Sequence, residues 1–180
     1  ETKDPYKIWI SEIMLQQTTI PAVIPYYKKW LKIFPTVQAL AKASPQRILK
    51  TWQGLGYYQR AKNIHKTSKI ILKSFKGKIP DTYEELVKLP GIGSYTAGAI
   101  LSIAYNKRYT ALEANALRVL SRILCIENPF TSKIENQLNA FQSRLLPLRN
   151  SGYFNQALME LGSLVCRNKN PLCMKCPIKF

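Results

Sequence analysis

Residues 89–93 of this 180-residue chain read Leu89-Pro90-Gly91-Ile92-Gly93, and this turn decides how the middle of the chain folds. Two glycines separated by one residue allow a tight turn and close approach of another backbone. A helical pattern starts next to it, so the N–H groups at Ser94 can face a phosphate. Over 82–105 the sequence predicts a helix, a turn and a helix. Gly91, Gly93 and Ser94 should contact a nucleic-acid backbone without reading bases, although such turns also occur in other helical proteins.

The charge of the chain supports the same interpretation. Its 27 basic and 10 acidic residues give a net charge of +17, which predicts a polyanionic partner. Nucleic acid is the leading candidate, and an anionic membrane surface is the alternative. No apolar run approaches the ~20 residues of a membrane span, and no amino-terminal signal pattern is visible. The chain begins at Glu1 and stops soon after Cys176, so we expect that both ends are trimmed.

The spacing of apolar residues predicts an all-α chain. Leu117, Leu120 and Leu124, for example, recur at helical spacing, and no alternating stretch is long enough to predict a sheet. Apolar residues make up 46% of the chain, which is enough for a sizeable core. The expected helices cover residues 5–16, 20–33, 36–41, 45–51, 57–75, 82–88, 94–105, 114–126, 132–145 and 153–166.

Capping signals and prolines set the boundaries of these helices. The signals are Ser44 with Pro45, Asp81 with Glu84, and Ser132 with Glu135. Pro21 and Pro25 interrupt the first helical run, so residues 16–19 should form an exposed corner.

Three of the four cysteines lie together near the end of the chain. Cys166, Cys173 and Cys176 have the spacing C-x6-C-x2-C, which gathers thiolates around a soft metal centre and favours metal over disulfides. Three cysteines leave one ligand position unfilled. An iron–sulfur cluster and a zinc ion held by four cysteines are the two candidates. Cys125 stands alone in an apolar stretch and is expected to be a small buried residue.

Two carboxylates are candidates for chemistry. Glu12 lies in the otherwise uncharged stretch 11–18, Ser-Glu-Ile-Met-Leu-Gln-Gln-Thr, where apolar neighbours would raise its pKa and suit a general acid. An exposed acid on a polar face is the alternative. Glu113 lies at an expected helix start, where free N–H groups favour its ionised form. A simple N-cap is the alternative for Glu113.

The stretch 11–18, the glycine turn and the cysteine spacing together resemble the helix-hairpin-helix DNA glycosylases, and among them the MutY-type adenine glycosylases. The resemblance covers nearly all 180 residues. It implies a two-lobed helical fold with an iron–sulfur loop at the C-terminus. One lobe would be the six-helix segment 20–126, which contains the hairpin. The other would combine 1–19 with 127–180.

The resemblance implies an N-glycosyl hydrolase of base-excision repair that removes adenine mispaired with 8-oxoguanine or guanine in double-stranded DNA. The base would be flipped out, Glu12 would protonate the adenine, and Glu113 would stabilise the sugar cation. The family has Asp-Gly-Asn where this chain has Glu113-Ala114-Asn115, so reduced activity is expected. Tyr95 stands where strand-cleaving relatives carry a nucleophilic lysine, which implies a monofunctional enzyme with Tyr95 beside the leaving base.

The resemblance also implies the residues that open the duplex and bind the substrate. Tyr57 matches the family's wedge position and Gln17 the residue beside it, and core packing is the alternative for the neighbouring Tyr58. Gln156 would pair with the adenine edge. The remaining expected contacts of the substrate are Leu15, Ile20 and Asn115. His65, the only histidine, is expected at the surface or as a backbone cap.

A [4Fe–4S] cluster is the cofactor that the resemblance implies, with the fourth cysteine two residues beyond Phe180. It would order a basic loop, Arg167 to Lys175, against DNA phosphates. A monovalent cation at the hairpin is also implied. The chain is expected to be a monomer without a membrane partner, in the bacterial cytoplasm or nucleoid, or in the nucleus or mitochondrion. The family's C-terminal domain, which recognises 8-oxoguanine, is absent from the sequence.

Three other interpretations stay open at this stage. A thymine- or uracil-removing glycosylase of the same superfamily could also carry Tyr95. A bifunctional lyase is disfavoured because the only nearby lysine, Lys88, lies before the hairpin. A catalytically impaired, cluster-bearing DNA-binding module is compatible with Glu113 and Ala114.

Overall fold

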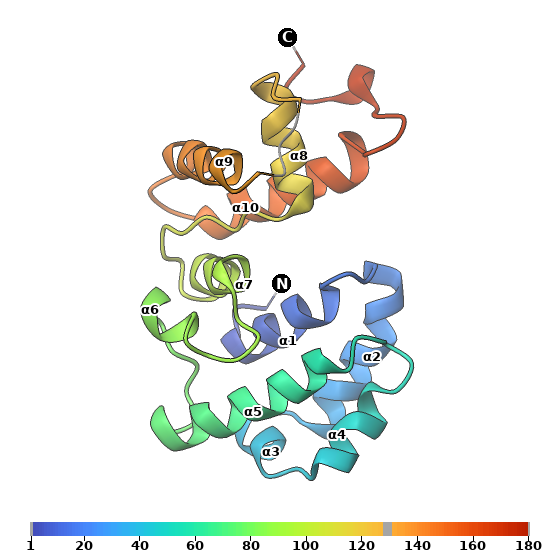
Figure 1. The fold of residues 1–180 in the computed structure, drawn as a ribbon, viewed down its shortest axis with the longest axis vertical. Coiled ribbons are helices and arrows are strands. Elements are labelled where there is room, and N and C mark those ends of the chain that lie inside the picture. Colours follow the sequence, from blue (N-terminus) through green and yellow to red (C-terminus); the bar gives the residue numbers. More distant parts are fainter. Residues whose placement is uncertain (1, 128–130, 180) are drawn as a thin grey trace. The chain divides into compact units, whose positions relative to one another are not determined.

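The computed structural model describes residues 2–127 and 131–179, and within these ranges it contains helices and no strand (Figure 1). The predicted all-α class is therefore confirmed. In chain order the α-helices are α1 Pro5–Leu15, α2 Ile20–Ile33, α3 Val37–Ala41, α4 Pro45–Trp52, α5 Gln59–Ser74, α6 Tyr83–Leu86, α7 Ser94–Ala99, α8 Ala114–Ile123, α9 Ser132–Leu145 and α10 Ser151–Glu160. Two π-helical turns, η1 Ile100–Ala104 and η2 Leu161–Val165, continue α7 and α10, and a 3₁₀ turn, η3, covers Cys173–Lys175.

All ten expected helices are present, but two of the three predicted caps were wrong by one residue. Ser44 accepts a hydrogen bond from the N–H of Arg47, as predicted. The N-cap of α6 is Thr82, not Asp81, and that of α9 is Thr131, not Ser132. Neighbouring polar residues can each supply a capping oxygen, so the choice between them depends on the backbone angles and not on the pattern.

Residues 16–19 form the expected corner between α1 and α2. Gln17 and Thr19 are exposed there, whereas Gln16 and Thr18 are half-buried. Pro21 occupies the first turn of α2, as expected. Pro25 lies inside α2, which covers the predicted range 20–33 without a break, so only Pro21 marks the interruption of the first helical run.

The chain divides into two compact units, Glu1–Ile100 and Leu101–Phe180. This division differs from the lobes expected from the sequence, because α1 packs within the first unit, against α2, α5 and α7. The expected lobe of 1–19 with 127–180 stays a prediction. No helix of the described ranges is both long and apolar enough to cross a bilayer.

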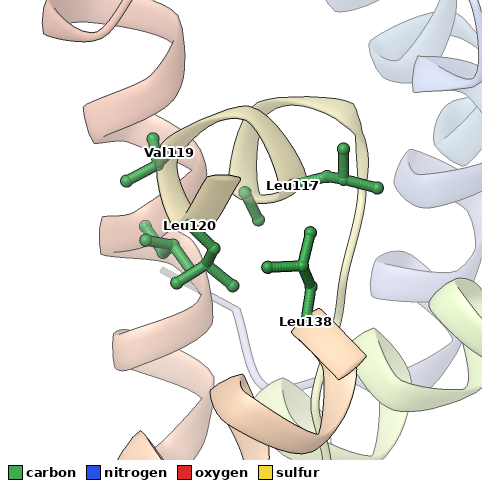
Figure 2. Packing of buried hydrophobic residues seen from close by; sticks show 6 residues of the cluster. Leu117, Val119, Leu120 and Leu138 are labelled. Atoms are coloured by element: carbon green, nitrogen blue, oxygen red, sulfur yellow. The ribbon is translucent and has the colours of Figure 1, made fainter. Parts of the chain in front are cut away.

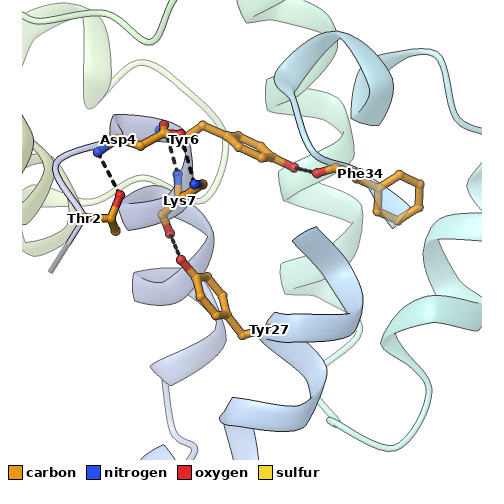
Figure 3. Close-up of polar contacts among 6 residues, drawn as sticks. All are labelled: Thr2, Asp4, Tyr6, Lys7, Tyr27 and Phe34. Atoms are coloured by element: carbon orange, nitrogen blue, oxygen red, sulfur yellow. Dashed lines mark hydrogen bonds and ion pairs between the residues drawn. The ribbon is translucent and has the colours of Figure 1, made fainter. Parts of the chain in front are cut away.

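The core of the first unit is aromatic. Trp30 lies edge-on to Phe34 and Trp52, with ring centroids 4.9 and 5.4 Å apart. Figure 3 shows how α1 is fixed against this core. The hydroxyl of Tyr6 donates to the carbonyl of Phe34 at 2.7 Å, and burial raises the pKa of Tyr6 far above its ordinary value. The first helix is thereby held in one position, together with the candidate acid Glu12 that it carries.

The core of the second unit forms where α8 packs against α9 and α10 (Figure 2). Its buried members are Ala116, Leu117, Val119, Leu120, Leu138 and Leu158. A polar bridge crosses the same interior: the amide of Gln142 donates to Asn155 at 3.0 Å, and Asn155 donates to Ser102 at 2.9 Å. These bonds join α9, α10 and η1 in a specific arrangement.

The exposure of three side chains differs from an interpretation that the sequence offered for each. Cys125 is exposed because it lies in the turn that ends α8. Its φ of 52° is the left-handed position of a Schellman turn, in which the N–H of Ile126 donates to the carbonyl of Ser121. Tyr58 is 42% exposed and is not a core residue. His65 is buried, because α5 packs this face against α3, and it hydrogen-bonds the backbone at Ala43 and Ala41, so the backbone-cap interpretation is confirmed and the surface one is not.

We predict that His65 makes the stability of the protein fall in mild acid. Burial lowers the pKa of His65 from its ordinary value of 6.5, so the folded state prefers the neutral ring. Its stabilising effect is complete above pH 6.5 and is lost as the pH falls below that value. Thermal unfolding between pH 7.5 and 5.5 measures this loss, at about 2–4 °C in Tm per kcal/mol. The His65→Gln variant should show a smaller fall, and equal falls would contradict the prediction.

Candidate functional site

The glycine turn between α6 and α7 has the conformation expected of a backbone contact. Gly91 has φ of +80°, and a Cβ at this position would lie 2.8 Å from the Cβ of Asn63, so that glycine is required on both counts. The hydroxyl of Thr67 on α5 donates to the carbonyl of Pro90 at 2.8 Å and fixes the turn.

Gly91, Gly93 and Ser94 are exposed. The N-cap of α7 is Gly93, which has no side-chain acceptor for the first N–H groups of the helix. The carbonyls of Leu89 and Pro90 each accept one hydrogen bond, from Ile92 and Thr67. Each keeps a second lone pair. The turn therefore presents donors that an anion can use and acceptors that a cation can use.

The strongest contact among the predicted catalytic residues joins α1 to α7. The hydroxyl of Tyr95 donates to the carboxylate of Glu12 at 2.5 Å, and both side chains are half-buried. These residues are 83 positions apart in the sequence, so the fold brings them together. Of the two interpretations of Glu12, an exposed acid on a polar face is excluded. A carboxyl group held by a phenol is suited to proton transfer.

The predicted wedge residues occupy two exposed corners of the first unit. Gln17 lies in the first corner, residues 16–19 between α1 and α2, and Tyr57 lies in the second corner, residues 53–58 between α4 and α5. Tyr57 is 62% exposed with φ of 46°, and Gln17 is exposed with φ of 56°. Positive φ is uncommon for residues other than glycine and concentrates at functional sites. Ile20 is 62% exposed near Gln17, and Leu15, half-buried, ends α1.

Glu113 is the N-cap of α8. Its carboxylate accepts hydrogen bonds from the N–H of Ala116 at 2.9 Å and from the amide of Asn115 at 3.0 Å. The capping role left open by the sequence is thus present. Gln156 is half-buried on α10, and its contact with adenine stays a prediction. Glu12 and Tyr95 belong to the first unit, Glu113 and Gln156 to the second.

Sequence reasoning missed the arginines that connect Glu113's neighbourhood to the cysteines. Arg118 donates to the side chain of Asn115 at 2.7 Å and to the carbonyl of Cys166 at 2.9 Å. Arg122 donates to the Sγ of Cys166 at 3.2 Å and to the carbonyl of Arg167 at 2.8 Å. The two arginines are four residues apart, which places them on one face of α8, but nothing in the sequence identified their acceptors.

The three clustered cysteines line one pocket of about 310 Å³. The rest of its wall is mainly apolar, from Val119, Ile123, Leu161, Val165, Pro171 and Ile178, with Arg122 at its edge. In the described ranges, no three His, Cys, Asp or Glu side chains are close enough to hold one metal ion. Three thiols on one pocket are a donor set that both candidates, an iron–sulfur cluster and a zinc ion, accept.

The comparisons with known proteins agree with this geometry. A family model described as "HhH-GPD superfamily base excision DNA repair protein" matches residues 10–143. The chain belongs to this superfamily. A solved structure of a thermostable thymine-DNA glycosylase has a TM-score of 0.90 to this fold at 28% identity, covering 98% of this chain and 82% of that one.

Curated relatives extend the comparison. The adenine DNA glycosylase of Buchnera aphidicola subsp. Schizaphis graminum is 48% identical over 177 residues, 98% of this chain and 51% of that protein. The adenine DNA glycosylase of Homo sapiens is 41% identical over 176 residues, 97% of this chain and 32% of that protein. The chain thus spans about half the length of the first relative and a third of the second.

We predict that Gly162 is needed to keep Asn115 in place. A Cβ at residue 162 would lie 2.6 Å from the Cβ of Asn115 and 2.7 Å from its carbonyl oxygen. Alanine favours helices by ~1 kcal/mol, but this overlap should lower the free energy of unfolding by ~1–3 kcal/mol. Urea unfolding of Gly162→Ala measures the change. Gly93→Ala is the matched control, because nothing lies within 4 Å of its Cβ. Equal stability of the two variants would refute the argument.

Proposed function

We propose that this chain is the catalytic core of an adenine DNA glycosylase, which removes adenine mispaired with 8-oxoguanine or guanine from double-stranded DNA. The observation that carries the proposal is the 2.5 Å hydrogen bond between Tyr95 and Glu12. It joins the two predicted catalytic residues of the first unit. The identity to relatives named adenine DNA glycosylases, 41–48% over nearly the whole chain, supports adenine as the base.

In the proposed mechanism Glu12 is the general acid. Its proton passes to a ring nitrogen of the flipped adenine, and the C–N glycosidic bond breaks with its electrons going to the base. Tyr95, which donates to the same carboxyl group, holds Glu12 in one orientation and stabilises the carboxylate that remains. Orienting the acid in this way removes part of the entropic barrier of proton transfer.

Glu113 is proposed to stabilise the sugar cation that forms next. Its negative charge is held by Asn115 and by the first turn of α8, and charge stabilisation works best where the charge develops. Water then adds to the cation, and its proton leaves to a carboxylate, as in glycoside hydrolysis. Because a glutamate stands where the family has aspartate, we propose that turnover is slow.

The absence of strand cleavage is a further part of the proposal. A Schiff-base lyase needs a lysine amine at the sugar. Tyr95 follows the hairpin at that position, and a phenol cannot form the imine. The enzyme is therefore proposed to release the base and leave the abasic strand intact.

We also propose a [4Fe–4S] cluster held by Cys166, Cys173 and Cys176, which are three of the four thiolates that such a cluster takes. The supporting observation is the apolar pocket that these thiols line. The cluster would order the loop that carries Arg167, Lys169 and Lys175 for phosphate contacts. The proposal also includes a monovalent cation bound by the carbonyl oxygens of the hairpin. The protein is further proposed to be a monomer. Its proposed location is the bacterial cytoplasm or nucleoid, or the nucleus or mitochondrion.

The likeness to a thymine-DNA glycosylase keeps thymine removal as the second candidate. A DNA-binding module without activity is the third. Duplexes with adenine opposite 8-oxoguanine, adenine opposite guanine and thymine opposite guanine separate the three, since each candidate predicts a different pattern of base release.

We predict that Glu12→Gln abolishes adenine release and leaves duplex binding intact. Loss of a general acid costs about 10²–10⁴-fold in rate, whereas the amide keeps the size of the side chain. Single-turnover assays on the 8-oxoguanine duplex, with and without alkali, measure release and strand cleavage. Glu160→Gln is the matched control, because Glu160 is exposed on α10. Unchanged release in Glu12→Gln would refute the assignment, and cleavage without alkali would refute monofunctionality.

We further predict that Glu113→Asp raises the rate of adenine release. The shorter side chain places its charge about one bond length closer to the backbone, and a misplacement of ~1 Å can cost ~10²-fold. Addition of Ala114→Gly should help by freeing the backbone. The single-turnover rates of the three proteins decide this point. A rate for Glu113→Asp no faster than that of the native chain would mean that Glu113 is adapted to its site or plays no part in the chemistry.

A further inference from the structure

Arg60 is buried between the two corners that carry the wedge residues. It lies at the start of α5 with only 8% of its surface exposed. Its guanidinium lies over the rings of Trp52 and Tyr57, 5.3 and 5.4 Å from their centroids. Burial lowers the pKa of Arg60 from its ordinary value, yet arginine stays charged in proteins. Burying a charge is costly unless hydrogen bonds or an opposite charge offset the loss of its hydration.

The hydrogen bonds of Arg60 run to both corners. One terminal nitrogen, Nη1, donates to the carbonyls of Ile13 at 3.1 Å, Met14 at 2.8 Å and Gln16 at 2.5 Å. The other, Nη2, donates to the hydroxyl of Thr18 at 3.3 Å and to the carbonyls of Leu55 at 3.2 Å and Gly56 at 3.3 Å. Nη1 thus binds the end of α1 and the first corner, and Nη2 joins the first corner to the second.

Two of these acceptors have a special position. The carbonyl of Gln16 comes directly before Gln17, and the carbonyl of Gly56 directly before Tyr57. Gln17 and Tyr57 have φ of 56° and 46°, a left-handed conformation that residues other than glycine keep only when their surroundings enforce it. Trp52 donates to the carbonyl of Gly56 as well, at 2.9 Å, and supports the second corner.

We propose that Arg60 is a positioning residue for duplex opening: it holds Gln17 and Tyr57 at a fixed separation and in the left-handed conformation from which their side chains enter the base stack. This inference rests on the proposed function only in requiring that the chain opens duplex DNA. One face of the Tyr57 ring lies on the guanidinium, while 62% of the residue stays exposed for stacking on a base. The planar fork of arginine is essential, because a lysine has three donors on one atom and cannot reach both corners.

The test uses Arg60→Lys in the 180-residue chain, with a duplex that carries 2-aminopurine opposite guanine as the probe. The fluorescence of 2-aminopurine rises when it is unstacked, so the rise reports insertion of the wedge before any base is released. We expect Arg60→Lys to bind the duplex as the native chain does, and to slow the rise by about 10- to 100-fold. Arg47→Lys is the matched control: Arg47 is exposed and lies over Phe34 at 5.6 Å.

A double-mutant cycle separates positioning from general stability. If Arg60 acts through Tyr57, Tyr57→Ala should slow the rise in the native background and much less in the Arg60→Lys background. Additive losses, an unchanged rise in Arg60→Lys, or an equal loss in Arg47→Lys would each overturn the proposal. So would the absence of any rise with the native chain.

If circular dichroism shows that Arg60→Lys does not fold, Thr18→Val replaces it. This change removes one acceptor of Nη2 and should slow the rise without weakening binding, and an unchanged rise would overturn the proposal. The fluorescence readout needs no base release. The proposed function fails if the native chain opens the duplex but releases no adenine, and the role of Arg60 is still decided in that case.

Discussion

Hydrogen bonds from arginine guanidinium groups to the backbone carbonyls at helix ends hold the loops of this protein in place. The last carbonyls of a helix have no partner within it, and a positive charge there is favoured by the helix dipole. Arg60 serves the end of α1, and Arg108 serves the end of α9 through Ser143 and Leu146. Arg118 and Arg122 serve the segment after α10, through Gly162 and Cys166. In each case the loop that follows carries residues of the candidate site or leads into the next helix of the core.

Because of these arginine contacts, only part of the net charge of +17 is available to bind a partner. At the level of composition, the whole excess indicates a polyanionic partner. The four arginines named above, however, and Arg167 through the carbonyl of Asn170, donate to carbonyls of the protein itself. The lysines of α5, Lys62, Lys66, Lys69 and Lys73, are exposed instead and are available to phosphates. The charge available to a polyanionic partner is thus largely that of lysine, which attracts phosphates as a mobile point charge, while the rigid fork of arginine orders the backbone.

The elements of the fold could be predicted from the sequence because they depend on local patterns. Helical spacing located all ten helices, and Ser44 with Pro45 gave the start of α4. The errors concern what a local pattern does not contain. Cys125 is exposed because a Schellman turn follows α8, and His65 is buried because α3 covers that face of α5. The bond between Glu12 and Tyr95, and those from Arg60 to Ile13, Met14, Gln16 and Thr18, join residues more than 40 positions apart. The sequence can name such residues, but only the fold pairs them.

One set of polar contacts joins Gly162 and Cys166, which lead into the clustered cysteines, to Glu113 at the N-cap of α8. Arg118 donates to Cys166 and Gly162 on one side and to Asn115 on the other, and Asn115 donates to Glu113. If the segment from Gly162 to Cys166 moved, Arg118 would lose two acceptors, and Asn115 would lose the fixed donor that orients its amide. Glu113 would keep its bond to the backbone of α8, which is local, but not its second donor in a fixed place. Order in residues 162–166, which lead into the clustered cysteines, therefore determines how firmly the carboxylate of Glu113 is held, although no cysteine contacts it directly.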